Sequence, residues 1–162
     1  MARIQMSFKG YRWSSLDVVV PEDKRDSYPV LWLLSDVTGR GDDFLRYTML
    51  EDFCRKSSCY VVCVSIGPND YEDHPYEDEA NWESYVTIFL WDLMHQIFPK
   101  ASEDAGSNYI AGVGSGIKGA RHFQKNHSEK YGKAFGLSEQ NPEDWKEIND
   151  ELGRLLLQMK YL

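Results

Sequence analysis

Long hydrophobic runs, basic residues and cysteines are all scarce in this chain of 162 residues. No apolar run approaches the roughly 20 residues that a membrane-spanning helix needs, and the first residues, MARIQMSFKGYRW, lack the features of a signal peptide. Lys and Arg number 18 against 26 Asp and Glu, a net charge of −8, so the average field repels nucleic-acid phosphates and anionic lipids. We therefore expect a cytoplasmic protein with neither a nucleic-acid nor a membrane partner.

The three cysteines, Cys54, Cys59 and Cys63, fit neither a disulfide framework nor a metal-binding knuckle. Cys59 and Cys63 lie beside and within an apolar run that is typical of a strand. Free cysteine is often buried as a small apolar side chain. We expect all three to be reduced and buried, and we expect no metal site.

Short apolar runs predict the strands. Val30–Leu34 is an apolar block that follows Pro29 and is too short for a buried helix, and Tyr60–Ser65 repeats this pattern. Two earlier runs, Ile4–Phe8 and Leu16–Val20, predict an antiparallel hairpin. Further strands are expected at residues 109–111 and 134–137.

Apolar residues recur at helical spacing between these runs. Residues 42–53 are predicted to form one crossover helix that Asp42 or Asp43 caps, and a second helix is expected over 82–98, where Pro99 ends it. Two more are expected over 116–127 and 142–161. Strands that alternate with such helices form a parallel sheet with right-handed crossovers. The sequence therefore predicts one α/β domain over residues 1–162, with 42% hydrophobic residues to form its core.

The segment 109–120 runs from a strand into a helix and is crowded with glycine. A nucleophile elbow, G-x-S-x-G, needs small residues two positions to either side of its strained central residue. Gly112 and Gly116 fit these flanks, which makes Gly114 the central residue. In the register that makes Ser115 central, the flanks are branched. The elbow is therefore predicted to present a position without a nucleophile.

The chain resembles the esterase family of α/β-hydrolases that includes tributyrin esterase and S-formylglutathione hydrolase (esterase D). The resemblance covers nearly the whole chain and is carried in order by the block 29–34, Thr38-Gly39, the Gly67-Pro68-Asn69 loop, the helix from Trp82 to Phe98-Pro99, and Ile110-Ala111-Gly112. It implies a three-layer α/β-hydrolase-like sandwich, an ester-cleaving Ser-His-Asp triad and no cofactor.

This sequence departs from the pattern of that family at its chemical positions. Ser35, Asp36 and Val37 stand where the family builds its oxyanion hole, and the carboxylate of Asp36 opposes the charge that such a hole stabilises. Gly114 corresponds to the nucleophile and Glu143 to the histidine of the family. The C-terminal strands that carry the triad aspartate have no counterpart, so the sheet is expected to be truncated.

We therefore expect no hydrolase activity and a binding or assembly role, with a small ester-like ligand, or with a second copy paired along the exposed sheet edge. One alternative is an active ester hydrolase in which Ser115 attacks with His122 or His74 as base. A second alternative is nucleotide binding, because Gly114, Gly116 and Gly119 spell G-x-G-x-x-G after a strand, with Glu139 about twenty residues further on.

The acidic loop 70–79 could hold a hard cation through its oxygen ligands, but its spacing fits no calcium loop. A solvated loop that borders the site is the favoured interpretation. His95, His122 and His127 have no metal-ligand spacing and are interpreted as surface or packing residues.

Overall fold

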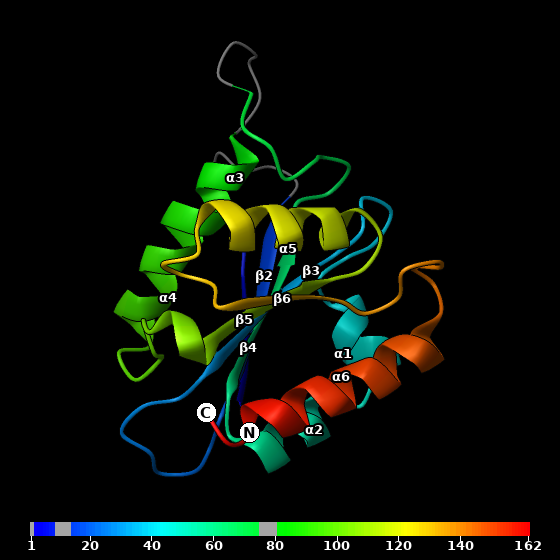
Figure 1. Ribbon diagram of the computed structural model, residues 1–162. Coiled ribbons are helices and arrows are strands. Elements are labelled where there is room, and N and C mark those ends of the chain that lie inside the picture. The colour runs from blue at the N-terminus through cyan, green and yellow to red at the C-terminus, as the bar shows by residue number, and fades with distance from the viewer. Residues whose placement is uncertain (1, 9–13, 75–80) are drawn as a thin grey trace.

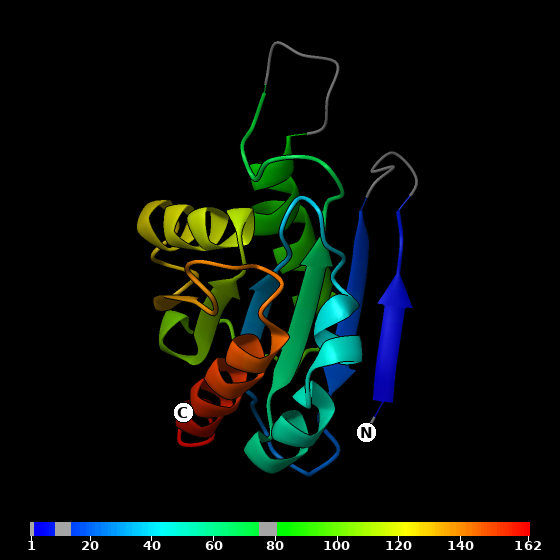
Figure 2. The same ribbon diagram turned by 90° about the vertical axis from the view of Figure 1, so that its right-hand side faces the viewer.

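The computed structural model describes residues 2–8, 14–74 and 81–162. Its centre is a six-stranded sheet in the order β1-β2-β4-β3-β5-β6, with helices on both faces (Figures 1 and 2). The strands are β1 (Ala2–Met6), β2 (Ser15–Val20), β3 (Val30–Leu34), β4 (Tyr60–Ser65), β5 (Asn108–Gly112) and β6 (Lys133–Gly136). β1 and β2 form the antiparallel hairpin, β2 is antiparallel to β4, and the other pairs are parallel. This is the α/β-hydrolase-like sandwich that the sequence predicted.

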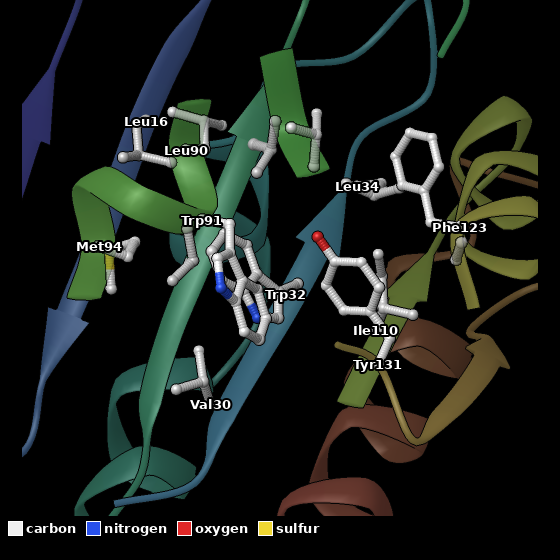
Figure 3. Packing of buried hydrophobic residues seen from close by; sticks show 14 of the residues in the cluster. Leu16, Val30, Trp32, Leu34, Leu90, Trp91, Met94, Ile110, Phe123 and Tyr131 are labelled. Atoms are coloured by element: carbon white, nitrogen blue, oxygen red, sulfur yellow. The ribbon is translucent and has the colours of Figure 1, made fainter. Parts of the chain in front are cut away.

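The two faces of the sheet bury separate apolar clusters. One face is covered by η1 (Tyr85–Leu90), α4 (Trp91–Ile97) and α5 (Ser115–Asn126). There the indoles of Trp32 and Trp91 stack at 5.7 Å beside the ring of Tyr131 (Figure 3). The other face is covered by α1 (Asp43–Tyr47), α2 (Leu50–Ser57) and α6 (Trp145–Met159). Their apolar side chains include Phe44, Leu50 and Leu152. Burial on both faces explains why the central strands read as continuous apolar blocks.

The predicted crossover helix over 42–53 is wrong in detail, because the structure has two helices there, α1 (Asp43–Tyr47) and α2 (Leu50–Ser57). Thr48 adopts an extended conformation, and the N–H of Met49 donates to Asn149 Oδ1 at 2.8 Å. Asp42 is the N-cap residue but makes no side-chain cap hydrogen bond. Its buried carboxylate pairs with Arg40 and Arg46 instead.

The helix predicted over 82–98 is present without a break over residues 82–97, but its middle is π-helical. It consists of one turn of α3 (Trp82–Ser84), a π-helical segment η1 (Tyr85–Leu90) and α4 (Trp91–Ile97). The remaining helices are η2 (Ala105–Ser107), α5 (Ser115–Asn126) and α6 (Trp145–Met159). A carboxylate cap starts α6, where Asp144 accepts from the N–H of Glu147 at 3.2 Å. Of the described helices, none has the length and apolarity to cross a membrane.

The three cysteines are free and fully buried. A hydrogen bond with Cys59, together with burial, raises the pKa of Cys54 above its ordinary value. Burial likewise raises the pKa of Cys63. A thiolate is the reactive form of cysteine, so neither residue is a nucleophile at neutral pH.

Candidate functional site

The elbow joins β5 to α5, and close backbone packing explains two of its glycines. A Cβ on Gly112 would lie 2.2 Å from the carbonyl atoms of Gly116, and a Cβ on Gly116 would lie 2.3 Å from the oxygen of Leu34. Between them, Gly114 has φ 56° and ψ −126°, a conformation that side-chain-bearing residues rarely adopt. The backbone therefore has the strained turn of a nucleophile elbow, with only a hydrogen atom at its centre.

Asp36 occupies the space beside Gly114. A Cβ on Gly114 would lie 2.2 Å from Asp36 Oδ1, so the carboxylate fills the volume in which a nucleophilic side chain would lie. The same oxygen accepts the N–H of Ser115 at 2.9 Å. Asp36 Oδ2 accepts the hydroxyl of Thr38 at 2.6 Å and the N–H of Thr38 at 3.3 Å.

These hydrogen bonds keep Asp36 ionised. Burial raises the pKa of Asp36, but the hydrogen bonds from Thr38 and Ser115 outweigh it and hold the pKa below its ordinary value. The N–H of Ser115 thus already donates to a fixed negative charge. An N–H at this place, just after the central residue of an elbow, is one of the donors that stabilise a substrate oxyanion in serine hydrolases.

Ser115 lies at the first turn of α5, and its hydroxyl accepts the N–H of Val37 at 3.1 Å. The predicted oxyanion-hole residues Ser35, Asp36 and Val37 therefore surround the elbow. Ser35 is buried, and its carbonyl oxygen accepts the hydroxyl of Tyr71 at 2.8 Å. Within the described part of the chain, no hydrogen bond joins Ser115 to an imidazole.

The histidines proposed as bases are held by carboxylates. His122 Nε2 lies 3.1 Å from Glu83 Oε2, and His74 Nε2 lies 2.8 Å from Asp70 Oδ1. His122 lines a shallow pocket of about 240 Å³ that Ser115 also lines. The same carboxylate of Glu83 also binds His127, whose Nε2 lies 2.9 Å from Oε1. Both ring nitrogens of His95 face backbone carbonyl oxygens. The latter two histidines hold helices and loops in place.

Three residues of the acidic loop come together. Ligand atoms of Asp70, Glu72 and His74 all lie within 4.8 Å of one another. Asp70 and Glu72 are exposed, and Lys118 Nζ lies 3.8 Å from Glu72. Glu77, Asp78 and Glu79, which the sequence analysis included, lie outside the described residues.

The glycine fingerprint has a packing explanation. A Cβ on Gly119 would lie 2.8 Å from the ring of Tyr71, so this glycine lets α5 approach that ring. A dinucleotide site places its pyrophosphate at the N-terminus of the helix. Here the carboxylate of Asp36 receives the first N–H of α5, so a phosphate would meet a negative charge. The geometry does not favour nucleotide binding.

A cavity of about 400 Å³ opens above the elbow, at the carboxyl ends of β3 and β5. Its wall includes Asp36, Val113 and Glu143, so the residue that the resemblance implies for the histidine position lies on the same cavity as the elbow. Tyr47 and Trp145 complete the wall. Neither residue is predicted as part of the site from sequence, because Tyr47 and Trp145 come from helices that meet only in the folded chain.

Strand order, antiparallel hairpin and elbow together define the α/β-hydrolase architecture. Among solved structures the chain is similar to a fluorophosphonate-binding serine hydrolase of Staphylococcus aureus, with a TM-score of 0.73 and 19% identity over 97% of this chain and 74% of that one. An S-formylglutathione hydrolase of Staphylococcus aureus matches with a TM-score of 0.70 and 20% identity over 99% and 74%. Another, from Agrobacterium tumefaciens, matches with a TM-score of 0.68 and 19% identity over 98% and 67%.

These similarities show that the chain has the fold of esterase-like α/β-hydrolases, as the sequence resemblance implied. At such identities the likeness shows the fold, and function has to be argued from the site. No protein-family model matches the sequence, and no curated protein matches it significantly.

Proposed function

We propose that the chain is a non-hydrolytic protein of the esterase fold, which binds a small ligand at the cavity above the elbow. The observation that carries this proposal is the pair formed by Gly114 and Asp36. The central residue of the elbow has no side chain, and a carboxylate fills the space where one would lie. The resemblance to esterases suggests a small ester-like molecule as ligand.

The proposed lack of ester hydrolysis follows from the groups that the elbow lacks. Ester cleavage through an acyl-enzyme needs a nucleophile with an adjacent base, and donors that stabilise the negative oxygen of the intermediate. Gly114 supplies no nucleophile, and the N–H of Ser115 donates to Asp36. The buried thiols of Cys54 and Cys63 supply none either.

An ester hydrolysis assay tests the proposal against its rival. We expect p-nitrophenyl acetate and butyrate to be cleaved no faster by the protein than by its Ser115→Ala variant, with an active esterase of the same fold as positive control. Saturable turnover that Ser115→Ala abolishes would establish the rival hydrolase. A fluorophosphonate probe should leave the intact mass unchanged, since it labels activated serines; an adduct on Ser115 would contradict the proposal.

Restoring a serine alone should not restore hydrolysis. Gly114→Ser leaves the base and its orienting acid absent, and the new side chain competes with Asp36 for space. We expect no p-nitrophenyl acetate turnover above that of the unchanged protein. Turnover that appears with this single substitution would show that a working base already faces the elbow.

The edge strand β6 supports a second role, in assembly. β6 has four residues, pairs with β5 on one side and has no partner strand on the other among the described residues. α6 packs against α2 and one face of the sheet rather than along this edge (Figure 1). Unpaired backbone groups at an edge can be satisfied by a strand of a second copy. Sedimentation at micromolar concentration should then show a dimer, and a lone 18.8 kDa species would overturn this role.

A further inference from the structure

Aromatic rings form one wall of the cavity above the elbow. Trp145, at the start of α6, is contacted edge-on by Phe44 at 5.8 Å and lies 5.2 Å from the ring of Tyr47. Phe44 is buried, whereas 56% of the surface of Tyr47 is exposed. The ring of Tyr47 is therefore open to solvent where it lines the cavity.

Carboxylates dominate the charge of the same cavity. Asp36, Asp43 and Glu143 line it, against a single basic residue, Arg40. The guanidinium of Arg40 is engaged by Asp42, with Nε 3.1 Å from Oδ1. The pKa of Asp36 is held below its ordinary value, so this residue stays ionised at neutral pH. The cavity combines aromatic side chains with an excess of negative charge.

We propose that the ligand of this cavity carries a small organic ammonium group. The face of an aromatic ring attracts a cation, and carboxylates nearby add Coulomb attraction. An anionic ligand is disfavoured, because the three carboxylates repel it. A bare metal ion would be attracted by the carboxylates but would not explain the aromatic wall. The volume of about 400 Å³ lies within the range of small-molecule sites. This inference rests on the proposed binding function and adds the class of ligand.

Choline and its neutral isostere 3,3-dimethylbutan-1-ol, in which carbon replaces nitrogen, form a matched pair of probes. We expect choline to bind roughly tenfold more tightly by isothermal titration calorimetry, because only the cation gains from the rings and carboxylates. In amide NMR spectra, choline should shift the signals of Gly39, Arg40 and the Trp145 indole. Equal affinity for the two probes, shifts elsewhere, or no choline binding at millimolar concentration would overturn the inference.

Substitutions at two cavity residues, each with a control, test whether choline binds in this cavity. Glu143→Gln should weaken choline binding roughly threefold to tenfold and leave the alcohol unaffected, whereas Glu103→Gln, the same charge change at an exposed residue that does not line the cavity, should change neither. Tyr47→Leu should weaken choline binding, and Tyr47→Phe should preserve it. Equal effects of Glu143→Gln and Glu103→Gln would refute a role for this cavity. Choline contains no ester bond, so ester turnover would refute the non-hydrolytic function without affecting this result.

Discussion

Gly114 and Asp36 are complementary in shape, and they follow two adjacent parallel strands, β5 and β3, at the same end of the sheet. The carboxylate of Asp36 fills the space beside Gly114, since a Cβ on residue 114 would lie 2.2 Å from Asp36 Oδ1. A side chain at position 114 therefore requires a smaller or displaced side chain at position 36. The positive φ of Gly114 adds a backbone cost that is independent of Asp36.

A double-mutant cycle separates these two costs. We expect Gly114→Ala to lower the free energy of unfolding by about 2–4 kcal/mol, from backbone strain and from the clash with Asp36. In an Asp36→Gly background the same change should cost about 1–2 kcal/mol, because only the strain remains. Urea unfolding of the four proteins measures this coupling. Additive costs would mean that the carboxylate moves away without loss.

Ionised Asp36 should also make stability depend on pH. Its pKa in the folded chain lies below the ordinary value, so its contribution is complete above the unfolded pKa of roughly 3.9 and is lost as pH falls through the folded pKa. Asp36→Asn should lower the free energy of unfolding by about 1–2 kcal/mol at pH 7, because an amide cannot accept from both Thr38 and Ser115 in the same way. The difference from the unchanged protein should shrink towards pH 3 in urea titrations. A constant difference would exclude Asp36 as the titrating group.

The glycine spacing predicted the elbow, but it did not predict that the carboxylate of Asp36 fills the space beside Gly114. Gly112 and Gly116 are small because the backbone of a sharp strand-to-helix turn is crowded, a local requirement that spacing reveals. The position of the Asp36 carboxylate against Gly114 depends on how β3 and β5 pair, and nothing in the local sequence specifies it. Asp36 is therefore recognisable from sequence as an unfavourable charge, whereas its place in the elbow is not. Tyr47 and Trp145 were missed for the same reason, because α1 and α6 meet only in the folded chain.

At the scale of elements, one carboxylate holds α3 to α5. Glu83 accepts from His122 at 3.1 Å and from His127 at 2.9 Å, and its side chain is only 20% exposed. This double link fastens the first turn before the π-helical segment to the helix that follows the elbow.

Loss of this link should destabilise the protein measurably. Glu83→Ala removes two partly buried hydrogen bonds, and we expect the free energy of unfolding to fall by about 1–2 kcal/mol. Glu129→Ala is the control: its carboxylate lies 3.8 Å from His127 and is 65% exposed, so the change should stay within about 0.5 kcal/mol. Urea unfolding compares the two variants. Equal effects would show that Glu83 acts as an ordinary surface carboxylate.

Strands were easier to predict than helices. Val30–Leu34 and Tyr60–Ser65 have the predicted bounds, because burial on both faces gives an unbroken apolar block. The break between α1 and α2 depends on Asn149, a partner far away in sequence. A pattern of period 3.6 does not reveal the π-helical turn of η1. In the structure Phe89 and Ile97 are exposed, although that pattern places them on the apolar face. β1 spans Ala2–Met6 rather than Ile4–Phe8, since Phe8 packs against Phe89 instead.

At the scale of the whole molecule, the order of strands and helices was predictable because alternation along the chain leaves few topologies open. The two-sided core also makes the three cysteines reporters of global unfolding. All three are fully buried, and their neighbours come from both the sheet and α2.

Thiol alkylation should therefore follow global unfolding. Under native conditions at neutral pH we expect iodoacetamide to label Cys54, Cys59 and Cys63 together and only as fast as the chain opens, since the thiols are inaccessible and burial raises the pKa of Cys63. Mass spectrometry in native buffer and in urea measures the rates. Rapid labelling of one cysteine in native buffer would reveal local opening of α2 or β4.

The Asp36 carboxylate also bears on how this protein would behave towards inhibitors. Boronic acids inhibit serine hydrolases as tetrahedral anions, bonded to the nucleophile and held by backbone donors at its side. In this chain an internal anion is already held by the amide of Ser115, and Gly114 offers no atom to bond to boron. We therefore expect boronic-acid reagents to form no adduct at this elbow, because the amide donor is engaged by Asp36 and no nucleophile stands at position 114.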